Sequence, residues 1–226
     1  MTNFRLENQI DQCAVLTEDT LNEKIIKLWS KEALSNECFY QTGYETILYN
    51  QSHYYAIETV ITSVLPWDKE LLLLGSTEAC VALKELVQKH AIAGHLMSDE
   101  TINITNVANA LQFYPEISHV LIHIESPEWL EQFAISDIVK TIVLAGREII
   151  VSCDASVTGL DDVVKSMITY LVGSFDEKDD KSFVVARRNK LVQTEGNARS
   201  LHYDLYANWQ WSMRKRTSVI EPMVFQ

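Results

Sequence analysis

Glycine and proline are scarce in this 226-residue sequence, which holds 7 glycines and 4 prolines. No linker rich in these residues, no internal repeat and no low-complexity tract interrupts the chain. Domain boundaries usually fall in such linkers, and roughly 200 to 250 residues can form one α/β domain. We therefore expect residues 1–226 to form a single domain, in which the segment 1–40 has no assigned role.

Clustered cysteines and long apolar runs are also missing. The 4 cysteines are far apart and form no CxxC or CxxH pattern, which excludes a recognisable zinc site or disulfide framework. No apolar run reaches the ~20 residues that span a bilayer, and the first residues, MTNFRLENQIDQ, do not resemble a signal peptide. These absences predict a cytoplasmic protein with reduced thiols and no membrane partner.

Positive charge is in short supply, since 19 Lys and Arg face 31 Asp and Glu, a net charge of −12. Nucleic-acid affinity depends on clustered basic residues, so we expect no nucleic-acid partner. The one basic cluster, Arg214, Lys215 and Arg216, follows Trp209 and Trp211. It suits either a membrane or RNA contact or, more simply, the last turns of a helix, whose dipole favours cations.

Apolar stretches of strand length recur along the chain and are mostly continuous rather than alternating, as in strands covered on both faces. They are 45–50, 70–75, 119–125, 147–153, 167–173 and 182–187. Segments with helical spacing lie between them, at 54–65, 76–90 and 127–146. This alternation predicts an α/β protein, a three-layer sandwich with a mainly parallel central sheet.

Polar residues end two of the predicted strands. His123 and Glu125 share one face of the first, and Ser152, Cys153 and Asp154 end the next. Ligands of open α/β sheets bind at the carboxyl ends of the strands. The pair His123 and Glu125 is therefore either part of a site or a hydrogen-bonded histidine beside a solvated carboxylate. Cys153 is either a nucleophile with His123 as its base or a small core residue.

Other chemical signatures are weak. The acidic run Phe175–Lys181 suggests a divalent metal but lacks the glycine and the spacing of a calcium loop, so we expect a surface turn and no metal. No GxGxxG, GxxxxGK[ST], GxSxG or HExxH string occurs. The common nucleotide-binding, hydrolase and zinc-protease motifs are thus absent.

The order of segments from Thr46 to Trp211 resembles the class V aminotransferases, and within them the 2-aminoethylphosphonate:pyruvate transaminases. The longest similar stretch is FVVARRNKLVQTEGNARSLHYDLYANW, residues 183–209. LYNQSHYYAIETVITSVLP (48–66), LIHIESPEWL (121–130) and IIVSCDASVTGL (149–160) also resemble family segments. The resemblance implies the large domain of the fold-type I aminotransferases, whose cofactor is pyridoxal phosphate (PLP). We expect the family's small C-terminal domain and its N-terminal Thr-Pro-Gly-Pro segment to have no counterpart.

The resemblance also implies where PLP would bind. The family's phosphate-binding Gly-Ser-Gly-Thr turn, which lies at a helix N-terminus, aligns with residues 51–54, where only Ser52 is retained and His53 and Tyr54 would crowd a phosphate. The aspartate that pairs with the pyridine nitrogen aligns with Ser152, although Asp154 could take its place in a shifted register.

The family's Schiff-base lysine aligns with Gly173. A gap could bring Lys178 or Lys181 into the site, but neither ends a predicted strand. We therefore expect a transaminase-like protein that has lost PLP-dependent catalysis, has no cofactor and acts as a binding or interaction module, linked by the resemblance to aminoethylphosphonate metabolism. The resemblance implies a homodimer or pairing with a related transaminase subunit.

Two alternatives stay open. One is a functional PLP-dependent aminotransferase or a binder of a small phosphorylated ligand, and the other is a decayed fragment that still folds. A remodelled pocket would be built from Ser52, His53, His123, Glu125, Ser152, Asp154 and Gly173.

Overall fold

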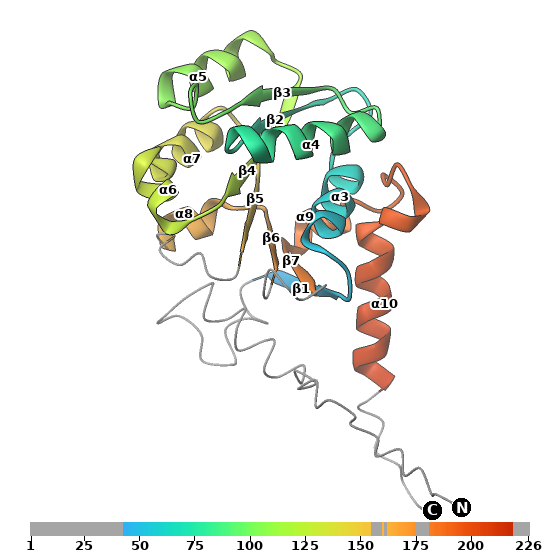
Figure 1. Ribbon diagram of the computed structural model, residues 1–226. Coiled ribbons are helices and arrows are strands. Elements are labelled where there is room, and N and C mark those ends of the chain that lie inside the picture. The colour runs from blue at the N-terminus through green and yellow to red at the C-terminus, as the bar shows by residue number, and fades with distance from the viewer. Residues whose placement is uncertain (1–42, 155–159, 161, 175–180, 219–226) are drawn as a thin grey trace, which may run out of the picture.

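A seven-stranded sheet forms the centre of the computed structural model, which describes residues 43–154, 160, 162–174 and 181–218. The strand order is β1-β7-β6-β5-β4-β2-β3 (Figure 1). The strands are β1 (Tyr44–Tyr49), β2 (Glu70–Leu74), β3 (Gly94–Met97), β4 (Ile117–Ile124), β5 (Glu148–Asp154), β6 (Tyr170–Ser174) and β7 (Ser182–Arg187). All neighbouring pairs are parallel except those of β7, which runs antiparallel to β1 and β6. The predicted, mainly parallel sheet is confirmed.

Helices cover both faces of this sheet, so the predicted three-layer sandwich is also confirmed (Figure 1). One core lies between the sheet and α5 (Ile104–Phe113), α6 (Pro127–Gln132), α7 (Ile135–Leu144) and α8 (Asp162–Met167). The other lies under α3 (His53–Val64), α4 (Thr77–Lys89), α9 (Arg188–Val192) and α10 (Leu205–Ser218). A short 3₁₀ helix, η1 (Leu201–Tyr203), precedes α10.

The structure differs from the sequence-based prediction in several places. The expected single helix 127–146 is two helices, because Ala134 takes a left-handed conformation (φ 48°) that ends α6 and begins α7. Trp129 and Ile135 are thereby both buried in the same core. The segment 167–173 begins as the end of α8, and β6 starts only at Tyr170. Strand β3 and helix α5 were not predicted.

Three further expectations concern membranes, metals and cysteines. None of the helices in the described part of the chain has the length and apolar character to cross a bilayer. The described residues also contain no group of three or more His, Cys, Asp or Glu side chains suited to a metal ion. Cys80 and Cys153 are buried, and no disulfide joins them. Residues 175–180 of the acidic run Phe175–Lys181 lie outside the described residues.

Candidate functional site

Three predicted site residues meet at the carboxyl edge of the parallel strands. Ser152 Oγ lies 3.0 Å from His123 Nδ1 and 3.0 Å from His53 Nε2, and the two imidazole rings are 6.0 Å apart. The parallel register of β4 and β5 pairs His123 with Ser152, which puts both side chains on one face of the sheet. His53 reaches them from the first turn of α3, which packs on that face. We call these three residues the His-Ser-His chain.

The hydrogen atoms of the His-Ser-His chain are constrained by its chemistry. A serine hydroxyl has one hydrogen to donate, so Ser152 donates to one imidazole and accepts from the other. One histidine therefore presents a bare nitrogen to Ser152 while the other presents an N–H, and both can be neutral. A proton gained or lost by His53 at the start of α3 can therefore change the hydrogen-bond direction at His123 in the sheet.

Burial keeps His123 neutral. Loss of hydration lowers the pKa of His123, and the negative charge of Glu125 opposes this only in part. At neutral pH the imidazole is therefore uncharged. His123 Nε2 has no hydrogen-bond partner in the part of the chain that the structure describes, so this nitrogen can still bind a ligand.

Two of the remaining polar candidates, Ser52 and Glu125, are held by helix caps. Ser52 is the N-cap of α3, and its Oγ accepts a hydrogen bond from the Tyr55 backbone N–H at 3.4 Å. Glu125 follows β4 and accepts a short hydrogen bond from Ser76 Oγ, whose residue is the N-cap of α4. Both side chains thus border the His-Ser-His chain but are already used in ordering the two helices.

Gly173 does not belong to this pocket, which corrects its predicted place there. It pairs with Cys153 of β5, not with Ser152, and so faces the opposite core. On that side it lies against the ring of Phe183 of β7, and a Cβ at Gly173 would come within 2.2 Å of the Phe183 Cζ atom. Phe183 is completely buried, so the ring occupies the space that a side chain at position 173 would need.

Cys153 likewise faces the core behind the sheet and is 3% exposed, so the pairing of its thiol with His123 is not formed. Asp154 is the last residue of β5 and pairs with Ser174 of β6. Its side chain and Lys178 lie outside what the structure describes. Lys181 directly precedes β7.

These observations test whether the described residues suit PLP, the cofactor that the fold implies. Neither a lysine nor space for one exists at Gly173. At the position of the family's aspartate, the fully buried Ser152 carries no charge and is already hydrogen-bonded on both sides. The aligned positions therefore do not fit a covalently held PLP with a paired pyridine nitrogen.

The energetic role of the His-Ser-His chain can be measured with Ser152→Ala. The substitution leaves one nitrogen of each of two half-buried imidazoles without its partner, and we expect the free energy of unfolding to fall by about 1.5 kcal/mol. Urea denaturation measures this change. Ser166→Ala, at an exposed residue of α8, is the matched control and is expected to have little effect. An equal stability for both variants would show that the His-Ser-His chain contributes nothing to the free energy of unfolding.

Comparisons with known proteins agree with this architecture. No protein-family model matches the chain. Two 2-aminoethylphosphonate–pyruvate transaminases, from Bacillus cereus strain G9842 and Bacillus anthracis strain CDC 684, are each 28% identical to it over 196 residues. These matches cover 83% of this chain and 51% of each relative. The chain thus spans about half the length of the curated relatives that it matches.

Solved structures show the same fold at much lower sequence identity. Ureidoglycine-glyoxylate aminotransferase from Bacillus subtilis superposes with a TM-score of 0.59 at 12% identity, over 86% of this chain and 50% of that protein. Pyridoxamine-pyruvate aminotransferase from Mesorhizobium loti gives a TM-score of 0.54 at 11% identity, over 88% and 57%. The chain therefore has the α/β fold of the fold-type I PLP-dependent aminotransferases, and its homologues by sequence are named as 2-aminoethylphosphonate–pyruvate transaminases.

Proposed function

We propose that this chain is a transaminase-like binding module that does not hold PLP covalently through any lysine. The observation that carries this proposal is the packing of Gly173 against the Phe183 ring, which leaves no room for a side chain. The uncharged Ser152 between two histidines supports it, because it replaces the carboxylate that would keep a pyridine ring protonated.

The ligand of such a module would bind at the carboxyl edge of the sheet, where open α/β sheets bind ligands. His123 Nε2 is one side-chain atom available for a direct hydrogen bond there. A small polar ligand, of which a phosphorylated one is an example, fits this chemistry, because a neutral imidazole can accept a hydrogen bond or, in its other tautomer, donate one.

The test is PLP titration of the purified protein, followed by borohydride reduction and mass spectrometry of its peptides. We expect no visible Schiff-base absorbance and no pyridoxyl adduct on any lysine. A thermal shift without an adduct would support a non-covalent site. A stoichiometric adduct on Lys178 or Lys181 would overturn the proposal, and the variants Lys178→Ala and Lys181→Ala would confirm which lysine carries it.

A second candidate function is that of a working PLP-dependent aminotransferase. The names of the sequence relatives favour it, and more directly than they favour a loss of catalysis. Lys181 also stands immediately before β7, whose first residue, Ser182, has its hydroxyl within hydrogen-bond distance of the Gln51 carbonyl (2.9 Å) and the Ser52 carbonyl (3.2 Å) beside the α3 N-terminus. Activity with 2-aminoethylphosphonate and pyruvate, lost in the variant of the lysine that forms the adduct, would establish this function.

The oligomeric state, the partners and the location of the protein stay predictions. The resemblance implies a homodimer or pairing with a related transaminase subunit, and the composition favours a cytoplasmic protein without nucleic-acid partners.

A further inference from the structure

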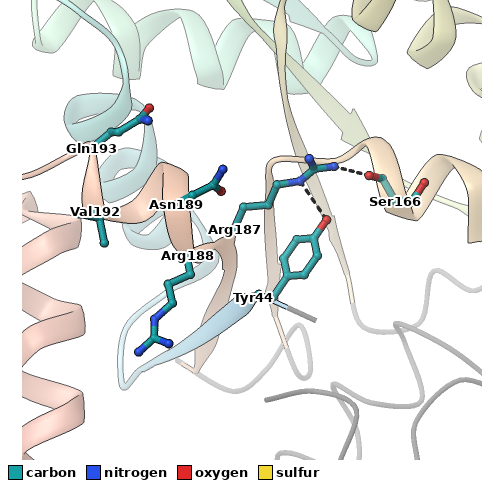
Figure 2. Close-up of a pocket in the computed structure, with 8 residues that line it drawn as sticks. Tyr44, Ser166, Arg187, Arg188, Asn189, Val192 and Gln193 are labelled. Atoms are coloured by element: carbon teal, nitrogen blue, oxygen red, sulfur yellow. Dashed lines mark hydrogen bonds between the residues drawn. The ribbon is translucent and has the colours of Figure 1, made fainter. Parts of the chain in front are cut away.

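A hollow opens at the other edge of the sheet, away from the His-Ser-His chain. It lies beside Tyr44 at the start of β1 and Arg187 at the end of β7, and α9 forms its other wall (Figure 2). Because β7 is antiparallel to β6, the end of β7 lies at the amino edge of the parallel strands. The cleft has a volume of about 920 Å³, which is within the range of small-molecule sites.

Arg187 places a positive charge in the wall of this cleft. Its Nε donates to Tyr44 Oη at 3.0 Å and to the Ile168 carbonyl at 3.2 Å, and its Nη2 donates to the Ser166 carbonyl. All these partners are neutral, and no carboxylate pairs with Arg187 among the described residues. The hydrogen bonds fix the guanidinium in place but leave its charge uncompensated.

Arg188 adds a second positive charge, which is only partly compensated. Its Nε lies 3.1 Å from Glu45 Oε1, and its side chain is 58% exposed. The two Nη groups have no partner within the described part of the chain, and the same holds for the side-chain amides of Asn189 and Gln193. The cleft therefore presents hydrogen-bond donors next to two guanidinium groups.

From these contacts we propose that the amino-edge cleft binds a small oxyanion, a carboxylate or a phosphate. A guanidinium fork matches both groups in geometry and charge. A positive cleft is unusual on a chain with a net charge of −12, and a cleft lined by one sign of charge concentrates ions of the other sign. The inference does not depend on the proposed function, because the two sites lie at opposite edges of the sheet.

Isothermal titration of the full chain with inorganic phosphate and, separately, with malonate tests this site, with sodium chloride used to hold ionic strength constant. We expect saturable binding of at least one anion. Arg188→Ala is expected to weaken it about tenfold, since a hydrogen bond to a charged group contributes about that much. The anion affinity of Arg188→Lys should lie between those of the wild type and Arg188→Ala, because lysine keeps the positive charge but lacks the guanidinium fork.

Two further variants sharpen the test. Glu45→Gln removes the carboxylate that competes for Arg188 and is expected to tighten binding several-fold. Arg214→Ala, at an exposed arginine of α10, is the matched control and should leave binding unchanged. Arg187→Ala is avoided because the Arg187 hydrogen bonds join β7 to α8 and β1.

Each binding result either supports or overturns the proposed anion site. Phosphate or malonate binding that responds to Arg188 supports the site and identifies the class of its ligand. The proposal is overturned if neither anion binds, or if Arg188→Ala binds as tightly as the wild type. It is equally overturned if His53→Ala, at the other edge, abolishes binding while Arg188→Ala does not.

Discussion

Replacing Gly173 with alanine is expected to lower the free energy of unfolding by about 3 kcal/mol, at the upper end of the usual cost of overpacking. The added Cβ would lie 2.2 Å from Phe183 Cζ and 2.6 Å from Cε1, distances that real contacts do not show. Phe183 is fully buried in the core of α5 to α8 and has no open space to move into. Urea denaturation at neutral pH measures the effect.

A double-mutant cycle shows whether the Phe183 ring is the cause. Phe183→Leu replaces the ring with a smaller side chain. The double variant Gly173→Ala/Phe183→Leu should therefore lose less free energy of unfolding than the sum of the two single losses, by more than ~1 kcal/mol. Gly94→Ala is the control, because its Cβ would meet nothing closer than 3.4 Å. Additive effects, together with a cost for Gly173→Ala no larger than that of the control, would contradict the packing that underlies the proposed function.

The sequence predicts most of the sheet because burial on both faces leaves a direct mark. Strand β7 was predicted at its observed bounds, and β1, β2, β4 and β5 within two residues at each end. A continuous apolar run records burial but not direction, so the antiparallel course of β7 could not be predicted from it. The edge strand β3, with half-exposed side chains in GHLM, carries no such run and was missed.

The site was harder to predict because it depends on register. The resemblance placed His53, Ser152 and His123 in one remodelled pocket, but their hydrogen-bonded contact rests on the pairing of His123 with Ser152, which no local pattern encodes. The position of Gly173 also depends on strand register. A shift of one residue along a strand moves a side chain to the opposite face, and position 173 falls on the face of Cys153 and Phe183.

Among the described residues, His119, away from both sites, is expected to give a large effect of pH on stability. Burial lowers the pKa of His119 from 6.5 to about 4. The negative charge of Glu148 raises this pKa in part, and the positive charge of Lys190 lowers it further. Between these values the unfolded chain binds a proton that the folded protein excludes, so stability falls as the pH decreases. Acidification from pH 7 to pH 5 is therefore expected to remove about 2 kcal/mol through this histidine alone.

Urea denaturation of the wild type and His119→Asn across pH 7 to 5 isolates this contribution, because other groups titrate alike in both proteins. The variant is expected to lose less stability on acidification, with the difference between the two curves reaching about 2 kcal/mol at pH 5. His202→Asn, at an exposed histidine, should keep the wild-type slope. Parallel curves for wild type and His119→Asn would mean that the folded protein protonates His119 as readily as the unfolded chain does. The histidine would then be hydrated, in conflict with its side-chain exposure of 7%.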